Sequence, residues 1–135
     1  MGGKRVLVVD DEPDFLEMMQ LRLELQGYEV LTAEDGRQAL ERVKKDKPDI
    51  VLLDIMMPVM NGLEVLKKIR SINRKLPVYI LTAFSNEERF RLAEQFSASG
   101  FIVKTKDLKE EIENIATALR MAPKFKGTRK ARRSR

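Results

Sequence analysis

The sequence predicts an α/β fold in which a five-stranded parallel sheet is covered by helices on both faces. Three observations lead to this prediction: five short apolar runs rich in β-branched residues, a helical pattern after each run, and short connections between them. Strands that are buried on both faces appear as continuous apolar runs. Strands that alternate with helices predict right-handed crossovers and a doubly wound, three-layer (βα)5 sandwich.

The five expected strands share this apolar, β-branched character. They span residues 6–9, 28–33, 50–53, 78–81 and 101–103. A first helix is expected from Pro13, because Pro favours the first helical position, and it should end at Gly27. A second helix should begin near Gly36 and bury Ala39, Leu40 and Val43.

The later helices are predicted from apolar spacing and from capping patterns. Val65, Ile69 and Ile72 recur at helical spacing and indicate a third helix. Residues 85–88 (SNEE) and 107–110 (DLKE) have the form of capping boxes and predict the starts of a fourth and a fifth helix.

The composition excludes several kinds of chemistry. The 135 residues include no Cys and no His, and this length predicts one domain with one core. Without His there is no Ser-His-Asp or Cys-His system, and without Cys there is no disulfide, thiolate nucleophile or zinc-thiolate site. The remaining carboxylates, hydroxyls and lysines favour hard cations and phosphoryl groups.

The positive charge of the chain lies in a short terminal segment. Residues 123–135 contain seven basic residues and no acid, whereas residues 1–122 contain 19 basic and 21 acidic residues. We expect one domain over residues 4–122 and a basic tail or linker without ordered structure over residues 123–135. A weak contact between this tail and nucleic acid is an alternative role. No apolar run reaches the length of a membrane span, and we expect a cytoplasmic protein with no membrane partner.

Polar residues follow several of the expected strands where each strand ends. Asp10 and Asp11 follow the first, Asp54 the third, Thr82 the fourth and Lys104 the fifth. The carboxyl ends of parallel strands meet at one edge of the sheet, where open α/β sheets bind their ligands. Clustered carboxylates repel one another unless a cation neutralises them, and Asp oxygens suit Mg²⁺.

Asp54 is the natural nucleophile of this group, because it ends the longest and most central apolar run. A carboxylate that attacks a phosphoryl group gives an aspartyl phosphate. Taken singly, Asp11 can cap a helix, Asp54 can begin a turn, Thr82 can satisfy a strand-end carbonyl and Lys104 can be a surface charge. The evidence is that these residues occur together at the strand ends.

Four segments together resemble the receiver domain of two-component response regulators. They are residues 8–13 (VVDDEP), 53–62 (LDIMMPVMNG), 81–83 (LTA) and 100–104 (GFIVK). The resemblance extends from residue 4 to about residue 122, in the family's order and spacing. It implies a flavodoxin-like sheet and Mg²⁺-dependent transfer of a phosphoryl group to Asp54.

The resemblance also implies individual roles. Mg²⁺ would be bound by Asp10, Asp11, Asp54 and the backbone carbonyl of Met56. Thr82 and Lys104 would contact the phosphoryl oxygens, the small Ala83 would leave the site accessible, and Thr82 with Phe101 would form the switch. The switch would remodel the face formed by the fourth helix, fifth strand and fifth helix.

The implied partners are a histidine kinase or a histidine phosphotransfer protein, and a downstream protein target or output domain. A homodimer is a further implied partner. The chain would not be an enzyme acting on metabolites, and would assist only its own phosphorylation and dephosphorylation.

One position departs from the family pattern. Thr105 stands where the family commonly has a cis-Pro after the Lys, and a non-Pro cis bond costs about 3 kcal/mol. We therefore expect a trans peptide or an altered loop there. Met56 and Phe84, which lack acid–base groups, suggest slow self-hydrolysis of the phosphorylated form.

Four alternatives remain at this point. A nucleotide- or flavin-binding domain lacks its glycine-rich motif here, and a metal-dependent phosphatase normally has a second Asp where Met56 stands. A pseudo-receiver would only bind proteins, and a nucleic-acid binder would act through the tail.

Overall fold

The structure is a computed structural model that describes residues 4–55, 61–82, 91, 94–95, 97–103 and 117. The described elements are, in chain order, β1 (Arg5–Val9), α1 (Pro13–Leu25), β2 (Glu29–Ala33), α2 (Gly36–Asp46), β3 (Ile50–Asp54), α3 (Gly62–Ile72), β4 (Val78–Thr82) and β5 (Gly100–Val103). Both predicted capping boxes and the basic tail lie outside the described residues.

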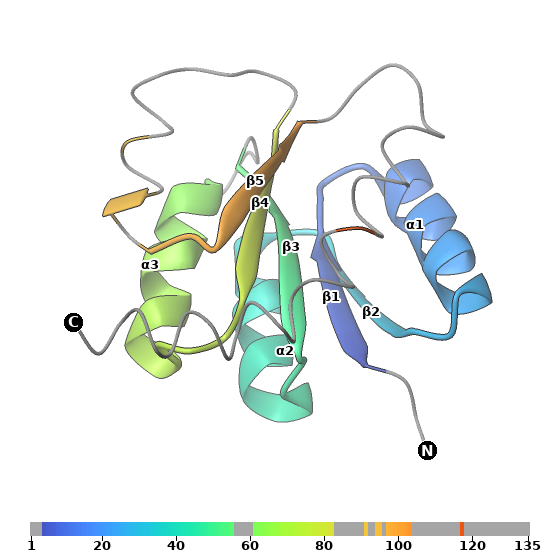
Figure 1. The fold of residues 1–135 in the computed structure, drawn as a ribbon, viewed down its shortest axis with the longest axis horizontal. Coiled ribbons are helices and arrows are strands. Elements are labelled where there is room, and N and C mark those ends of the chain that lie inside the picture. The colour runs from blue at the N-terminus through green and yellow to red at the C-terminus, as the bar shows by residue number, and fades with distance from the viewer. Residues whose placement is uncertain are drawn as a thin grey trace.

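All five strands form one parallel sheet with the order β2-β1-β3-β4-β5 (Figure 1). The predicted parallel sheet is therefore confirmed, and β3 is its central strand. Every residue of β3 is buried, as expected for a strand that is covered on both faces. Because β1 and β3 are neighbours, their carboxyl ends lie side by side.

The helices cover opposite faces of this sheet. Residues of α2 and α3, such as Val43 and Ile69, share one buried cluster with Leu7, Leu53 and Ile80. The second cluster lies on the other face, where Leu16, Met19 and Leu23 of α1 pack against the sheet. Figure 1 shows α1 on one side of the sheet and α3 on the other. The three-layer arrangement follows from strands whose alternate side chains enter different clusters.

The helix ends agree with the local sequence signals. Pro13 is at the start of α1, and Gly27 follows the helix with a φ of 94°, a conformation that Gly adopts without steric cost. At the start of α2, the side chain of Asp35 accepts a hydrogen bond from Gln38 N at 2.8 Å. Asn61 caps α3 in the same way, accepting from Glu64 N at 3.0 Å.

The strand boundaries differ from the prediction by one residue at several ends. Asp54 and Thr82, expected directly after their strands, are the last residues of β3 and β4, and Gly100 is already part of β5. Tyr28, expected in the second strand, precedes β2. Asp54, Thr82 and Gly100 extend their strands through backbone pairing, which the pattern of apolar side chains does not predict. Among the described helices, none has the length and apolar character needed to cross a membrane.

Candidate functional site

The carboxyl ends of β1 and β3 bring three carboxylates together. Asp10, Asp11 and Asp54 each offer an oxygen, and these oxygens all lie within 4.8 Å of one another. Asp10 is fully buried and Asp54 is 5% exposed, whereas Asp11 is exposed to solvent. The cluster therefore has two buried carboxylates, those of Asp10 and Asp54, and one solvent-exposed carboxylate, that of Asp11.

Backbone contacts fix the segment that carries Asp10 and Asp11. The backbone N–H of Asp10 donates to Ala33 O at 3.1 Å, which ties the end of β1 to the end of β2. One carboxylate oxygen of Asp10 accepts a hydrogen bond from Glu12 N at 2.9 Å. Glu12 is the N-cap residue of α1 and makes no side-chain capping bond, so Asp11 does not cap this helix. Asp11 is left at the edge of the sheet, beside Asp54.

The position of Asp54 depends on close packing around the end of β3. Its backbone pairs in register with Leu81 of β4. Gly62, the first residue of α3, lies so close that a Cβ there would be 2.5 Å from Asp54 O and in severe contact with Ile55 Cα. Gly62 N also donates to Ile55 O at 3.1 Å. Only a residue without a side chain allows α3 to begin against this backbone.

Gly62 has no individual role in the sequence-based prediction. The signal that could have identified it is the pair Asn61-Gly62 directly before the apolar stripe of α3. An N-cap residue followed by Gly at the first helical position indicates a close approach to a neighbouring backbone as well as a helix start.

The donor set fits a hard divalent cation. Three carboxylate oxygens within 4.8 Å repel one another, and burial of Asp10 and Asp54 increases that repulsion because water screens it less. A divalent cation would neutralise most of this charge. Oxygen ligands from one or two carboxylates, with the remaining positions left to water or phosphate, are typical of Mg²⁺.

The other predicted site residues are described only in part. Thr82 ends β4 and its backbone pairs with Val103, and Phe101 pairs with Ile80 within the sheet. The side chains of Thr82 and Phe101 lie outside the described part of the structure. The residues Met56, Ala83, Phe84, Lys104 and Thr105 lie outside it entirely. Their assigned roles therefore stay predictions.

Comparison with known proteins places this arrangement in a family. A family model described as the response regulator receiver domain matches residues 6–116. The chain is 36% identical over 118 residues to the alkaline phosphatase synthesis transcriptional regulatory protein PhoP of Bacillus subtilis, a match covering 87% of this chain and 49% of PhoP. It is 38% identical over 115 residues to the probable transcriptional regulatory protein TcrX of Mycobacterium tuberculosis, with 85% and 49% covered. The chain thus spans about half the length of these curated relatives.

Solved structures agree with the sequence comparison. The chemotaxis protein CheY4 of Vibrio cholerae superposes with a TM-score of 0.81 and 32% identity, covering 90% of this chain and 99% of CheY4. The response regulator TrrA of Thermotoga maritima, solved in complex with Mg²⁺ and BeF, has a TM-score of 0.73 and 37% identity, with 84% and 97% covered. With its parallel sheet and its acidic cluster at the ends of β1 and β3, the chain belongs to the receiver domain family of two-component response regulators.

Proposed function

We propose that this chain is a phosphorylation switch in which Asp54 accepts a phosphoryl group. The observation that carries the proposal is the cluster of Asp10, Asp11 and Asp54, because it combines a carboxylate nucleophile at the end of the central strand with two further cation ligands. Family membership supports the same assignment, since acceptance of a phosphoryl group is the known role of receiver domains.

Mg²⁺ would be held by Asp10, Asp11, Asp54 and the backbone carbonyl of Met56. When bound, it would supply positive charge that offsets the carboxylates and the incoming phosphoryl oxygens. An oxygen of Asp54 would attack the phosphorus of a phosphohistidine. The new O–P bond would form as the P–N bond breaks, and the electron pair would return to the imidazole of the donor.

The remaining roles follow from the family pattern in the sequence. Lys104 and the hydroxyl of Thr82 would contact the phosphoryl oxygens and balance their charge. Thr82 and Phe101 would then transmit the change to the surface formed by the fourth helix, β5 and the fifth helix. Thr82 and Phe101 lie on the neighbouring strands β4 and β5, which supports a coupled movement of the two residues.

The phosphoryl donor would be a histidine kinase or a histidine phosphotransfer protein, because this chain has no His of its own. The target would be a downstream protein or an output domain. The receiver domain would also pair with a second copy as a homodimer. The receiver unit would cover residues 4–122, followed by the basic tail. The chain would assist its own phosphorylation and dephosphorylation and act on no metabolite.

The test is labelling with a small acyl-phosphate donor in the presence of Mg²⁺. We expect one added phosphoryl group by intact-protein mass spectrometry, lost in base and retained in acid, and no labelling of Asp54→Asn. The matched control is Asp49→Asn, which removes an exposed carboxylate at the other end of β3. Labelling that survives Asp54→Asn, or an unlabelled wild type, would contradict the proposal and favour a pseudo-receiver.

A further inference from the structure

The described surface is divided by charge between the two helical layers. α1 (residues 13–25) contains three acidic residues and one basic residue, a net charge of −2. α2 (residues 36–46) and α3 (residues 62–72) together contain seven basic and three acidic residues, a net charge of +4. Because α1 lies on the opposite side of the sheet from α2 and α3 (Figure 1), the described helices give the sheet one acidic and one basic side. Such a polarity attracts one copy to the next in a head-to-tail orientation.

The basic side contains a cavity of about 330 Å³ between the C-terminal ends of α2 and α3. Its floor is apolar, since it is formed by the buried residues Val43, Pro48 and Leu76. Ile72 forms a further apolar wall and is 42% exposed, which makes it one of three large exposed apolar side chains in the described part of the chain. We call this cavity, with its rim, the α2–α3 pocket.

The rim of the α2–α3 pocket is formed by Lys44 and Lys47. Within the described residues, the ion pairs are Arg5–Glu29 and Arg42–Asp46, so neither rim lysine has a carboxylate partner there. The dipole of α2 favours a base at both positions, because Lys44 lies in the last turn and Lys47 is the C-cap residue, whose φ of 47° is in the left-handed region common at helix ends. Two lysines without a carboxylate partner among the described residues, beside an apolar cavity, favour an occupant that is acidic at its edge and apolar at its centre.

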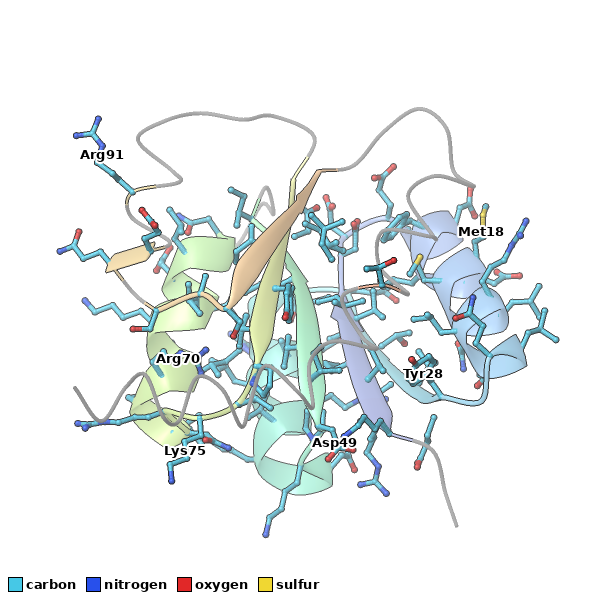
Figure 2. All side chains as sticks on the ribbon, viewed as in Figure 1. Met18, Tyr28, Asp49, Arg70, Lys75 and Arg91 are labelled. Atoms are coloured by element: carbon cyan, nitrogen blue, oxygen red, sulfur yellow. The ribbon has the colours of Figure 1, made fainter. Side chains whose placement is uncertain are left out.

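The acidic side carries the matching feature on α1. The other two large exposed apolar side chains are Leu21, which is 59% exposed, and Leu25, which is 78% exposed. With the partly exposed Met18, they recur at i, i+3 and i+7 along one stripe, which we call the α1 ridge. Figure 2 shows Met18 on the side of α1 that faces away from the sheet. Glu17 and Glu24 stand beside the ridge in sequence and are exposed.

We propose that a second copy of this chain docks its α1 ridge into the α2–α3 pocket. An amphipathic helix whose anchors recur at i, i+3 and i+7 is the usual occupant of an apolar groove. Leu21 and Leu25 would bury against Ile72 and the pocket floor, while the carboxylates beside the ridge would face Lys44 and Lys47. Opposite charge would orient the approach, and apolar burial would hold the contact.

This contact is heterologous, because it joins two different surfaces of the same chain. A head-to-tail dimer leaves the ridge of one copy and the pocket of the other unused, so association continues until a ring closes or a short filament forms. The contact is also remote from the acidic cluster, since the pocket lies at the end of the sheet opposite to Asp54. It should therefore form without phosphorylation.

The test uses the full chain and sedimentation velocity over a range of concentrations. The ridge variant carries Leu21→Gln and Leu25→Gln, and the pocket variant carries Lys44→Glu and Ile72→Gln. All four positions are exposed and helical, and Gln and Glu are good helix formers, so both variants should fold. We expect the wild type to associate at low salt and to dissociate as salt rises. Each variant alone should need at least about tenfold higher concentration to associate.

Mixing the two variants gives the sharpest result. The ridge variant keeps an intact pocket and the pocket variant keeps an intact ridge, so an equimolar mixture should form dimers that cannot grow further. Arg37→Glu, which makes a similar charge change at the other end of α2, should associate like the wild type. Circular dichroism confirms that each variant is folded. A wild type that stays monomeric, variants that still associate, or a mixture that remains monomeric would each overturn the proposal.

Discussion

Gly62 lies directly against the backbone carbonyl of Asp54: a Cβ at residue 62 would be 2.5 Å from that oxygen. The start of α3 is thereby held against the end of β3, the strand that presents the candidate phospho-acceptor. Real Cβ atoms do not approach an oxygen so closely, so a larger residue at position 62 must displace α3, Asp54 or both.

Gly62→Ala is therefore expected to affect both stability and the site. Accommodating the methyl group should lower the free energy of unfolding by about 1–3 kcal/mol, and displacement of Asp54 should slow its labelling by the acyl-phosphate donor. Urea denaturation and the labelling rate measure the two effects.

Gly27→Ala is the control, because Gly27 has a φ of 94° and no atom within 4 Å of its missing Cβ. It should cost about 1 kcal/mol through backbone strain and leave labelling unchanged. Equal labelling of Gly62→Ala and wild type would show that the contact does not position Asp54.

Mg²⁺ is expected to stabilise the folded chain, because the acidic cluster exists only in the folded state. At a free concentration ten times the dissociation constant, binding adds about 1.4 kcal/mol to the free energy of unfolding. The melting temperature should therefore rise as MgCl₂ is added. Asp11→Asn removes one carboxylate at the open side of the cluster, so it should raise the melting temperature without Mg²⁺ and reduce the increment with Mg²⁺. NaCl at matched ionic strength is the control; an equal rise with NaCl would argue against a specific site.

Arg70 joins three segments, and its replacement should be costly. Its guanidinium donates to the carbonyls of Ser97 at 3.0 Å, Asn73 at 3.1 Å and Leu76 at 2.6 Å, which connects α3 to the loop before β4 and to the segment before β5 (Figure 2). Arg70→Ala should lower the free energy of unfolding by about 1–3 kcal/mol, because it leaves these acceptors without their donor. Arg70→Lys should recover only part of the loss, since an ammonium cannot reproduce the forked geometry. Arg74→Ala, at an exposed neighbouring position, should change the free energy of unfolding by less than about 0.5 kcal/mol. If Arg74→Ala destabilised the chain as much as Arg70→Ala, the hydrogen bonds of Arg70 would not explain its effect.

The cap of α3 gives a smaller and more local effect. Asn61 accepts a hydrogen bond from Glu64 N, so Asn61→Ala should cost about 1 kcal/mol, whereas Asn61→Asp should keep most of the stability. Chemical denaturation of the three proteins provides the comparison. If Asn61→Asp lowers the free energy of unfolding as much as Asn61→Ala does, the Asn61 side chain does more than cap the helix.

Much of this architecture can be predicted from the order of residues. The apolar runs at residues 50–53 and 78–81 and the buried pair Val65 and Ile69 locate strands and a helix, because each element must bury its own apolar side chains. Ile72, the last residue of the predicted stripe, lies in α3 but is 42% exposed. Pro13 and Gly27 mark the two ends of α1 through local backbone preferences. The same alternation also predicts that Asp10, Asp11 and Asp54 share one edge of the sheet.

Which strands are neighbours, and how close their side chains come, depends on packing across the whole chain. The order β2-β1-β3-β4-β5 puts β1 beside β3, and this pairing brings three carboxylates within 4.8 Å. The contact of Gly62 with Asp54, the three acceptors of Arg70 and the pocket between α2 and α3 likewise join residues that are remote in sequence. Local periodicity specifies which face of an element is buried, but distances between elements arise from close packing of the whole core. In this protein the order of residues predicts which carboxylates stand at one edge of the sheet, and packing sets the distances between them.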